Sequence, residues 1–410
     1  MDLRVKSTNN FRGFDARRLQ GFIMGQNPHG IASEMMSIGK KENFKLFFLT
    51  KDTAHFTTKT DFQRSSDIDR RLWVQDYLTI ANGKLFSLNF DKQADFIRQF
   101  FGLKKDLTQI AMRTGPDYQK AMSELYKIYP MYREEPESFS KIYMNLYTIQ
   151  HDTHIPGGNM YMVKLSDDTE GLIVGKDELK KFTRDEIQTM YGASKLTVLP
   201  QMDYHTDLFI RPLDNKQILL ADDNLTLECM QNMLKKISAK KNHLPFFKRL
   251  KYKSLEHNLK SKIIEFKMEM NKNTLPKADD IEKILKKSGY KVIRVPGRIY
   301  ECNRDSDGDM ILHHSCNYIN AHAMKNDKGE LVYITNKSAF DKEIGLTEQI
   351  SKELDCSFEK EFIKSVSPYV NPNHIYFIEG EDGFVANEML PTYLGGIHCA
   401  ASEIPENIAK

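Results

Sequence analysis

The feature that most constrains the fold is the recurring order of strand pair, helix and strand along the 410-residue chain. Runs rich in β-branched and aromatic residues, which are typical of strands, occur at 44–50, 78–90, 159–165, 196–200, 208–222, 290–297, 331–335 and 375–380. Stretches with helical periodicity occur at 92–111, 119–128, 226–241, 255–270, 279–288 and 347–356. This order predicts an α/β protein with small mixed sheets rather than one long parallel sheet.

Turn and capping residues set the limits of several of these elements. The sequences "ANGK" at 81–84 and "LDNKQ" at 213–217 divide two strand-like runs into apolar halves, which predicts hairpin tips. Asp279 and Asp280 precede the apolar stripe of "IEKILKKSGY". Because a glycine follows that stripe, the segment has both the acidic start and the glycine end that are expected of a helix.

No linker rich in proline or glycine divides the chain. We expect the weakly patterned residues 1–43 to form an N-terminal extension and 44–410 to form one large domain, with a helical insert at 226–270. Within the insert, the stretch 235–253, "KKISAKKNHLPFFKRLKYK", holds eight Lys and Arg and no acidic residue. It is either a solvated helical face with a loop around Pro245, or a surface for an acidic partner or anionic lipid.

Composition narrows the class of protein. A formal charge of +3 is too small to indicate global attraction to nucleic acid. The five cysteines lie far apart without a C-x-x-C pair, which argues against a disulfide framework and for a reducing compartment. The first residues contain no apolar signal-peptide core, and no apolar run reaches the length of a membrane span. We therefore expect a cytoplasmic protein, or one exported without a cleaved signal peptide.

Four short motifs carry residues that are suited to chemistry. Cys399 ends "GGIHC", behind a glycine pair, and Asp76 ends "WVQD". His205 and Asp207 are two residues apart in "HTD", a spacing that directs both side chains to one face of a strand. A second glycine pair stands before Asn159 at the start of a strand-like run, where it suits a close approach of the backbone.

A thiol, an imidazole and two carboxylates without a metal match the needs of one reaction. A cysteine protease needs only one acid or amide to orient its histidine, so a second carboxylate is surplus there. A guanidinium is planar and cationic, and two carboxylates can bind its N–H groups from different edges. Its central carbon is a poor electrophile and calls for a thiolate, while one histidine can protonate the departing amine and then activate water.

The motifs "WVQD", "HTD" and "GGIHC", in this order, resemble those of the guanidine-modifying enzymes of the pentein fold. These enzymes are the peptidylarginine deiminases, agmatine deiminases, arginine deiminases and amidinotransferases, and the motifs are most similar to the first two. The resemblance implies a pentein α/β propeller of five ββαβ-like units around a pseudo-fivefold axis, with the active site in its central channel. The catalytic domain would cover 44–410 and carry the basic helical insert at 226–270.

Two departures from the family pattern bear on the substrate. Agmatine deiminases carry an acidic residue before the glycines of the second motif, where this chain has Ile155 and Pro156. The chain also has no room for the immunoglobulin-like domains of the vertebrate peptidylarginine deiminases, so their calcium regulation is not carried over.

The resemblance assigns a role to each motif residue. Asp76 and Asp207 would hold the guanidinium nitrogens, and the Cys399 thiolate would attack the central carbon to give a thiouronium intermediate. His205 would transfer the protons, whereas His398 is expected to be structural or to act through another residue. The residues expected to shape the substrate pocket are Trp73, Asn159 and Gly396.

The function expected from these roles is hydrolysis of an arginine guanidino group to a ureido group, giving citrulline and ammonia. The expected substrate is arginine within a protein or peptide, and no cofactor is required. Alternatives are an agmatine deiminase, an amidinotransferase in which an amine replaces water, and a catalytically inactive pentein binding module. If the chain is such a binding module, the basic stretch 235–253 would be its binding surface.

Two patterns suggest a metal site, but neither is complete. The run "NRDSDGDM" at 303–310 has the spaced acids of a calcium loop, yet His314 stands where a bidentate Glu would close it. His313 and His314 have no third ligand at a suitable spacing. We expect a solvated acidic turn followed by the edge of a strand, and no metal.

Overall fold

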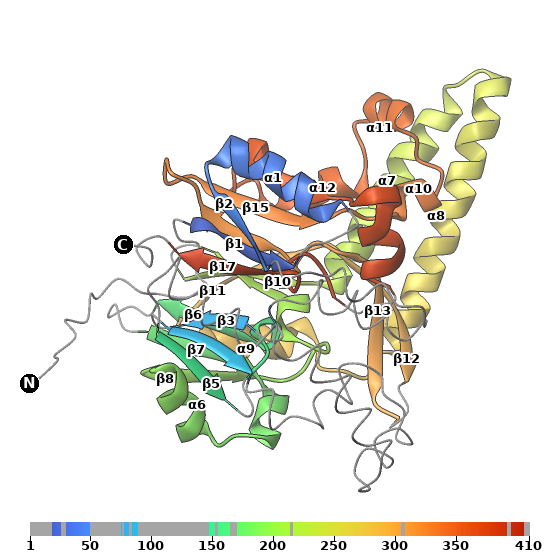
Figure 1. The fold of residues 1–410 in the computed structure, drawn as a ribbon. Helices are drawn as coiled ribbons and strands as arrows, with labels where there is room; N and C mark the ends of the chain where they lie inside the picture. Colours follow the sequence, from blue (N-terminus) through green and yellow to red (C-terminus); the bar gives the residue numbers. More distant parts are fainter. Residues whose placement is uncertain are drawn as a thin grey trace, which may run out of the picture.

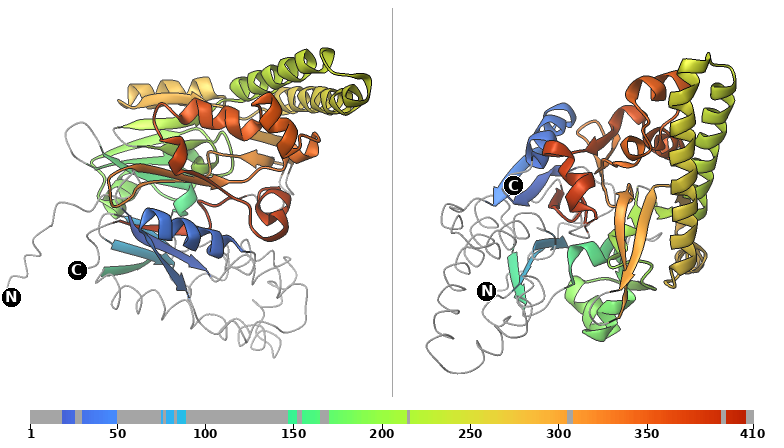
Figure 2. Two further views of the ribbon diagram at one scale, coloured as in Figure 1. Left: turned by 90° about the horizontal axis from the view of Figure 1, so that it is seen from above. Right: turned by 90° about the vertical axis from the view of Figure 1, so that its right-hand side faces the viewer.

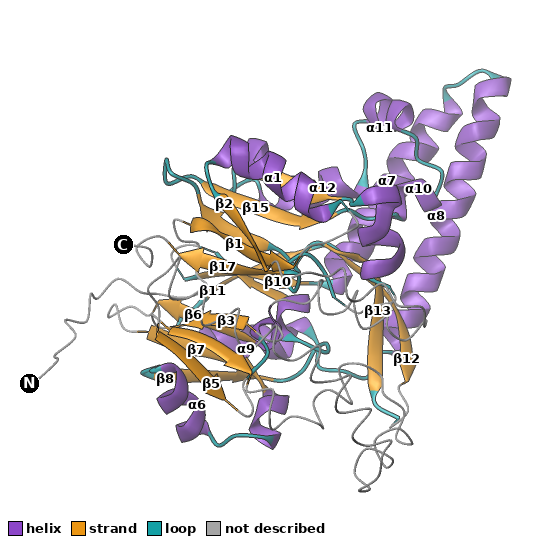
Figure 3. Cartoon of the chain, in the orientation of Figure 1, coloured by secondary structure: helices purple, strands orange, loops and turns teal. Residues whose placement is uncertain are grey.

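The computed structural model describes residues 19–25, 30–49, 75, 78–81, 84–88, 147–151, 155–164, 170–213, 216–304, 308–391 and 395–405. The predicted helices at 92–111 and 119–128 lie outside these residues, and so do Trp73 and Asp76. Strands occupy the interior and helices lie around them, as Figure 3 shows by colour. The predicted α/β class with small mixed sheets is confirmed.

Five of the described sheets share one pattern, in which a middle strand is antiparallel to one neighbour and parallel to the other. They are β17(Ala401–Pro405)-β1(Leu19–Gly25)-β2(Lys45–Leu49), β3(Leu78–Ala81)-β4(Lys84–Leu88)-β5(Tyr147–His151), β6(Met160–Lys164)-β7(Glu170–Gly175)-β8(Lys195–Leu199), β9(Ile210–Pro212)-β10(Gln217–Ala221)-β11(Lys291–Val295) and β14(His322–Lys325)-β15(Leu331–Asn336)-β16(Ile375–Ile378). A further pair is β12(Arg298–Arg304)-β13(Met310–Asn317). In four of these five sheets, the two antiparallel strands follow one another in the chain, and a crossover connection leads to the third strand. In the fifth sheet, β17 returns to pair with β1.

Both predicted hairpin tips are confirmed by the strand pairing. Strands β3 and β4 pair antiparallel down to Ala81 opposite Lys84. Strands β9 and β10 meet at 213–217, where the backbone N–H of Leu213 donates to the carbonyl of Gln217 at 2.7 Å. Lys216 adopts a φ of 61° in this turn, a left-handed conformation that tight turns require.

The described α-helices are α1(Ile31–Glu42), α6(Arg184–Tyr191), α7(Asp223–Asn242), α8(Phe246–Lys272), α9(Ala278–Lys287), α10(Phe340–Glu343), α11(Glu348–Leu354) and α12(Phe358–Val366). Helix α9 has both the capped start and the buried apolar face that its sequence predicts. Asp280 accepts from the backbone N–H of Lys277, which caps the start, while Ile281 and Leu285 bury one face. No helix among the described residues is long and apolar enough to cross a bilayer.

Strand β1 and helix α1 lie in the segment that the sequence analysis set apart as 1–43. Phe22 of β1 pairs with Glu403 of β17 on one side and with Leu46 of β2 on the other. Ile31 and Met35 of α1 are fully buried in the same apolar cluster as Phe22. The structure therefore ties these elements to the C-terminal strand, and the division into an extension and a catalytic domain stays a prediction.

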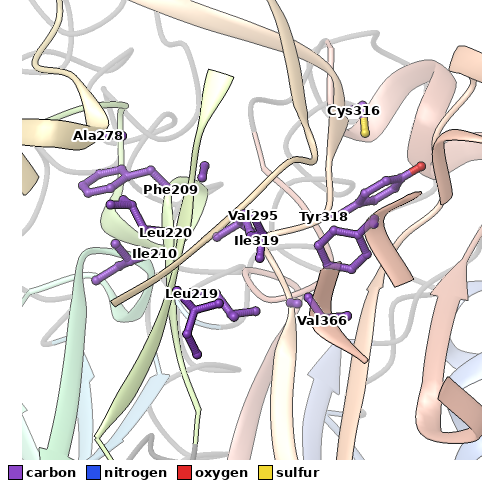
Figure 4. Close-up of a cluster of buried hydrophobic side chains, with 14 of the residues drawn as sticks. Phe209, Ile210, Leu219, Leu220, Ala278, Val295, Cys316, Tyr318, Ile319 and Val366 are labelled. Atoms are coloured by element: carbon purple, nitrogen blue, oxygen red, sulfur yellow. The ribbon is translucent and has the colours of Figure 1, made fainter. Parts of the chain in front are cut away.

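Among the residues that the structure describes, two apolar clusters form the core. The larger spans β6 to β16 and the helices around them; Figure 4 shows part of it, where Leu219 and Leu220 of β10 lie near Val295 of β11. The smaller cluster packs β1, α1 and β15 against the residues before β17, and it includes Cys399. Because burial of apolar area drives this packing, the segment that carries Cys399 is fixed by the core.

Helices α7 and α8 form a long antiparallel hairpin along one edge of the molecule (Figure 1). The predicted helices at 226–241 and 255–270 are both longer in the structure, and the break between them falls at Pro245, as expected. Glu256 of α8 joins the two helices, since it accepts from Ser238 at 3.0 Å and pairs with Lys241.

Candidate active site

Cys399 lies directly before strand β17, with only 6% of its surface exposed. Its Sγ is 3.1 Å from Oδ2 of Asp207 and 3.3 Å from Nδ2 of Asn320. Two of the residues that the sequence analysis selected, 192 positions apart, are therefore in direct contact.

Two buried asparagines hold the backbone that carries the thiol. Oδ1 of Asn320 accepts from the backbone N–H of His398 at 2.9 Å, and Oδ1 of Asn336 accepts from that of Ile397 at 2.8 Å. A Cβ on Gly396 would lie 2.5 Å from Oδ1 of Asn320 and 2.7 Å from Nδ2 of Asn336. Glycine is needed here because the backbone packs directly on these amides. Contact of Gly396 with the substrate stays a prediction.

The carboxylate of Asp207 is the centre of the site. Its Oδ2 accepts from Nδ2 of Asn320 at 2.9 Å, from Nδ1 of His398 at 2.8 Å and from the Cys399 thiol at 3.1 Å. Since a thiolate this close to a carboxylate would be repelled, Cys399 carries its proton in this arrangement and donates it to Asp207.

His398 is a neutral donor to Asp207. Its Nε2 lies 3.3 Å from the Nε2 amide of Gln75, which donates to it, so the ring proton sits on Nδ1. Burial holds the pKa of His398 well below its ordinary value, and the positive charge of Arg211 adds to the effect. His398 therefore orients Asp207 without adding a charge to the site.

Gln75 also brings the first motif to the thiol. Its backbone N–H donates to the carbonyl of Cys399 at 3.2 Å, so Gln75 of the motif "WVQD" contacts the residue that carries the thiol. Asp76 and Trp73 lie outside the described residues, and their roles stay predictions.

His205 and Asp207 flank a common point beside Gly158. A Cβ built on Gly158 would lie 2.8 Å from Nδ1 of His205 and 3.0 Å from Oδ2 of Asp207. Our expectation that a strand carries them is wrong, because His205 caps the 3₁₀ turn η7(Thr206–Leu208) that precedes β9. The turn still directs both groups to one place, which is what the spacing was taken to indicate.

The partly exposed residue His205 carries no charge at neutral pH. It stacks on Tyr204 with ring centroids 4.4 Å apart. Burial lowers its pKa to about 4, and the nearby charge of Lys181 acts in the same direction. At neutral pH His205 is therefore uncharged and able to accept a proton.

Asn159 fixes the turn that carries these two side chains. It lies in η5(Gly157–Asn159), and its Oδ1 accepts from the backbone N–H of Thr206 at 3.2 Å. Its Nδ2 donates to Oε1 of Glu178 at 2.6 Å, and the hydroxyl of Thr206 donates to the carbonyl of Gly158 at 3.1 Å. These bonds make Asn159 a structural support, while its contact with the substrate stays a prediction.

Sequence reasoning missed the asparagines and a buried ionic network behind His398. Nη2 of Arg211 lies 2.7 Å from Oε1 of Glu403, and Nδ1 of His322 lies 2.8 Å from the same oxygen. The other ring nitrogen of His322 is 3.0 Å from the carbonyl of Ile397, two residues before Cys399. The available signal was a polar residue inside an apolar run, as in "YINAH" and "VYITN", because buried polar groups need partners.

One cluster among the described residues has the composition of a metal site. Ligand atoms of His322, His398 and Glu403 all lie within 4.8 Å of one another. However, Arg211 already places a cation on the Glu403 carboxylate. The geometry is thus that of an ion-paired network that supports the loop of Cys399.

Comparison with known proteins gives limited information. No protein-family model matches the chain, and no curated protein matches it. Among solved structures, the fold is similar to agmatine deiminase from C. jejuni, with 12% identity, a TM-score of 0.44 and 96% of each chain covered. It is also similar to DDAH from Pseudomonas aeruginosa, in the structure of a cysteine-to-serine mutant complexed with citrulline. In this comparison the identity is 9%, the TM-score is 0.39, and the match covers 94% of this chain and 100% of that chain. At these values the likeness does not define the reaction, so the proposal below rests on the contacts of the site.

Proposed function

We propose that this chain is a cysteine-dependent guanidine hydrolase that converts a guanidino group to a ureido group and releases ammonia. The observation that carries the proposal is the 3.1 Å contact between Sγ of Cys399 and Oδ2 of Asp207. A carboxylate beside the nucleophile would repel the negative charge that forms when a neutral acyl group is attacked. The same carboxylate would attract a cationic substrate. His205, uncharged and beside the same carboxylate, supplies the base.

Substrate binding would use the carboxylates. A guanidinium offers N–H donors in a planar fork, and Asp207 would accept from one edge, with Asp76 predicted to accept from another. The substrate cation would also favour the thiolate, because it adds a positive charge next to Sγ of Cys399. Ionisation of the nucleophile is thereby linked to occupancy of the site.

The reaction would proceed in two halves. The thiol proton of Cys399 passes to His205, and the thiolate attacks the central guanidinium carbon to form a C–S bond. His205 returns the proton to the departing nitrogen, so ammonia leaves and a thiouronium remains. His205 then takes a proton from water, whose oxygen attacks the same carbon to form a C–O bond. The C–S bond breaks, the new hydroxyl gives its proton to the departing thiolate, and the ureido product is released. His205 passes the proton from water to solvent, where it protonates the released ammonia, so the starting state is restored.

We also propose that the five sheets of common pattern are the five ββαβ units of a pentein propeller around a pseudo-fivefold axis. The support is their shared pairing and the return of β17 to β1, which would close a ring of units. The predicted position of the active site in the central channel is part of this proposal.

Arginine within a protein or peptide is the proposed substrate, with agmatine as the alternative. Incubation of the purified protein with an arginine peptide, arginine and agmatine, followed by ureido and ammonia assays, tests both. We expect turnover that is absent from Cys399→Ala and present in Cys229→Ser, a variant of a half-buried cysteine in α7. Ammonia release without an added amine would support the hydrolase, whereas a new guanidino compound that forms only with an added amine, with release of the donor's own amine and no ammonia, would indicate the amidinotransferase.

Trapping with a haloacetamidine distinguishes the enzyme from an inactive binding module. We expect a mass increase on the wild-type protein that Cys399→Ala lacks. Equal labelling of the two proteins, together with no turnover of any guanidino compound, would overturn the proposal.

The proposed setting is a reducing compartment. All five cysteines are free thiols in the structure, and a free nucleophilic thiol persists only where disulfide formation is disfavoured. The cytoplasm is the predicted compartment, and export without a cleaved signal peptide stays the alternative.

A further inference from the structure

The turn of the α7–α8 hairpin carries exposed aromatic residues. We call residues 243–253 the hairpin tip. Phe246 and Phe247 open helix α8 there, 68% and 85% exposed, and Leu250 one turn later is 54% exposed. These are the residue types that folding normally buries, so three of them together at the end of a hairpin indicate a surface made for contact.

The hairpin presents this tip at a corner of the molecule that is distant from the sheets. The turn between α7 and α8 lies beyond the other described elements in both views (Figure 1, Figure 2). Helix α11 holds the base of the tip, since Tyr252 donates to Glu353 of α11 at 3.0 Å and Lys240 pairs with the same carboxylate at 3.0 Å. Arg249 closes the turn by donating to the carbonyl of Leu244 at 3.1 Å.

The tip is also positively charged. The lysines of α7 nearest to it form ion pairs, Lys240 with Glu353 and Lys241 with Glu256. By contrast, Lys248, Lys251 and Lys253 are exposed and form no ion pair with the described residues. These three exposed lysines lie within the same hairpin tip as Phe246, Phe247 and Leu250 and give it positive charge.

We propose that the hairpin tip binds an anionic phospholipid surface. Aromatic rings that enter the headgroup region and lysines that meet the lipid phosphates are the two contributions of an interfacial anchor. A convex tip with three apolar side chains suits a fluid bilayer better than a protein partner, because a specific protein interface buries about 800 Å² per partner on matched surfaces. The observations do not involve the active site, so the inference is independent of the proposed reaction.

Flotation with phospholipid vesicles tests this inference. The purified full chain is mixed with vesicles of phosphatidylcholine, or of phosphatidylcholine with phosphatidylserine, and the bound fraction is measured. We expect binding to the mixed vesicles only. Raising the salt from 0.1 to 1 M shortens the screening length from about 10 to about 3 Å, so binding should weaken.

Two variants separate the two contributions. The double variant Phe246→Ser and Phe247→Ser should lower the partition coefficient at least about tenfold, because it removes the apolar contact. The double variant Lys248→Gln and Lys251→Gln should lower it about 30-fold, at roughly fivefold per cation. All four positions are exposed, so thermal unfolding should stay at the wild-type temperature.

Matched controls lie elsewhere on the same surface. Ile264→Ser and Met268→Ser change apolar side chains of α8 that are 59% and 54% exposed but far from the tip. Lys283→Gln and Lys287→Gln remove two exposed cations from α9. These variants and Cys399→Ala should bind vesicles as the wild type does.

Three results would overturn the inference. They are no binding to the mixed vesicles, equal binding to neutral and anionic vesicles, and tip variants that bind as well as the controls. Self-association of the lipid-free protein that the Phe246→Ser and Phe247→Ser variant abolishes would show that a second copy covers the tip instead.

Discussion

Two buried clusters of this protein differ in the group that contacts their aspartates. In one, the guanidinium of Arg298 lies between two carboxylates, with Nη1 3.1 Å from Oδ2 of Asp203 and Nη2 3.1 Å from Oδ2 of Asp223. In the other, Oδ2 of Asp207 accepts from the Cys399 thiol at 3.1 Å. The first cluster thus contains, as part of the chain, the same arrangement that the proposed substrate would adopt at the second.

The two aspartates have a similar histidine neighbour. Nε2 of His314 is 2.9 Å from Oδ2 of Asp203, and Nδ1 of His398 is 2.8 Å from Oδ2 of Asp207. The chain therefore uses buried carboxylates oriented by imidazoles in both places, and a thiol takes the position of the arginine in one. The comparison shows that buried carboxylates of this chain hold a guanidinium at Arg298. At Asp207 a thiol contacts the carboxylate instead, and the proposed reaction would place the substrate guanidinium there.

The largest expected effect comes from removing that sulfur. Cys399→Ala should lower kcat about 10⁴-fold or more, because no other group replaces the nucleophile. Steady-state ureido formation measures it. Cys302→Ala, a partly buried cysteine of β12, is the control; if Cys399→Ala retains more than a tenth of the activity, the thiol is not the nucleophile.

Removing the negative charge of the carboxylate beside the thiol tests whether this carboxylate binds the substrate cation. Asp207→Asn should lower kcat/KM about 10³-fold, because the substrate cation loses a buried charged partner. The hydrogen-bond acceptor at this position remains, so the urea midpoint should change little. An unchanged kcat/KM in this variant would show that the guanidinium binds elsewhere.

A substitution in the Arg298 cluster should lower stability and leave turnover largely unchanged. Arg298→Met leaves Asp203 and Asp223 buried without their cation, and should lower the free energy of unfolding by about 3–5 kcal/mol. Urea unfolding followed by fluorescence measures it. Turnover per folded molecule should stay within a few-fold of the wild type, and a selective loss of kcat would mean that this cluster is not purely structural.

A smaller effect is expected from the amide between thiol and carboxylate. Asn320→Ala removes the donor to both Asp207 and Cys399 and the acceptor for the backbone of His398. We expect kcat to fall about 10–100-fold, since one buried hydrogen-bonding group is worth roughly 1–3 kcal/mol. Asn326→Ala, in the turn after β14, controls for loss of a buried amide away from the site and should keep kcat.

The smallest effect is a pH dependence of stability from His205. Its folded-state pKa of about 4 lies below the ordinary value of 6.5, so the unfolded chain binds the proton more tightly. Stability should therefore fall as the pH drops from about 6.5 to about 4. Urea unfolding across this range should show a smaller loss for His205→Gln than for the wild type, whereas identical losses would show that this ring does not titrate in the window.

Elements with strong local signals were predictable from the sequence. The hairpins at 78–90 and 208–222 carry turn residues between apolar halves, and α9 carries an acidic start and a glycine end. Helix α1 was missed because it follows Gly30 and contains Gly39, and glycine lowers helical propensity. Of the β12–β13 hairpin, the strand edge at His313 and His314 was predicted, and both residues lie in β13. Strand β12 was missed because it is rich in polar residues, and only the tertiary structure shows that Arg298 is buried between Asp203 and Asp223.

The candidate site was predictable in part. Cys399, His205 and Asp207 were selected because their chemistry is uncommon in combination, although their turn was taken for a strand. Asn320 and Glu403 carry no such signal, because an asparagine or glutamate in an apolar run is ordinary until its partners are known. Their contacts join residues far apart in sequence, such as Arg211 with Glu403, and local pattern does not encode such pairs.

The pairing of β17 with β1 has a consequence for how the site assembles. Phe22 is among the first described residues and Glu403 among the last, so this sheet can form only after almost the whole chain has been synthesised. Long-range pairings of this kind form slowly. During translation or refolding, the sulfur should therefore meet its carboxylate last, and enzymatic activity should return later than the bulk of the secondary structure.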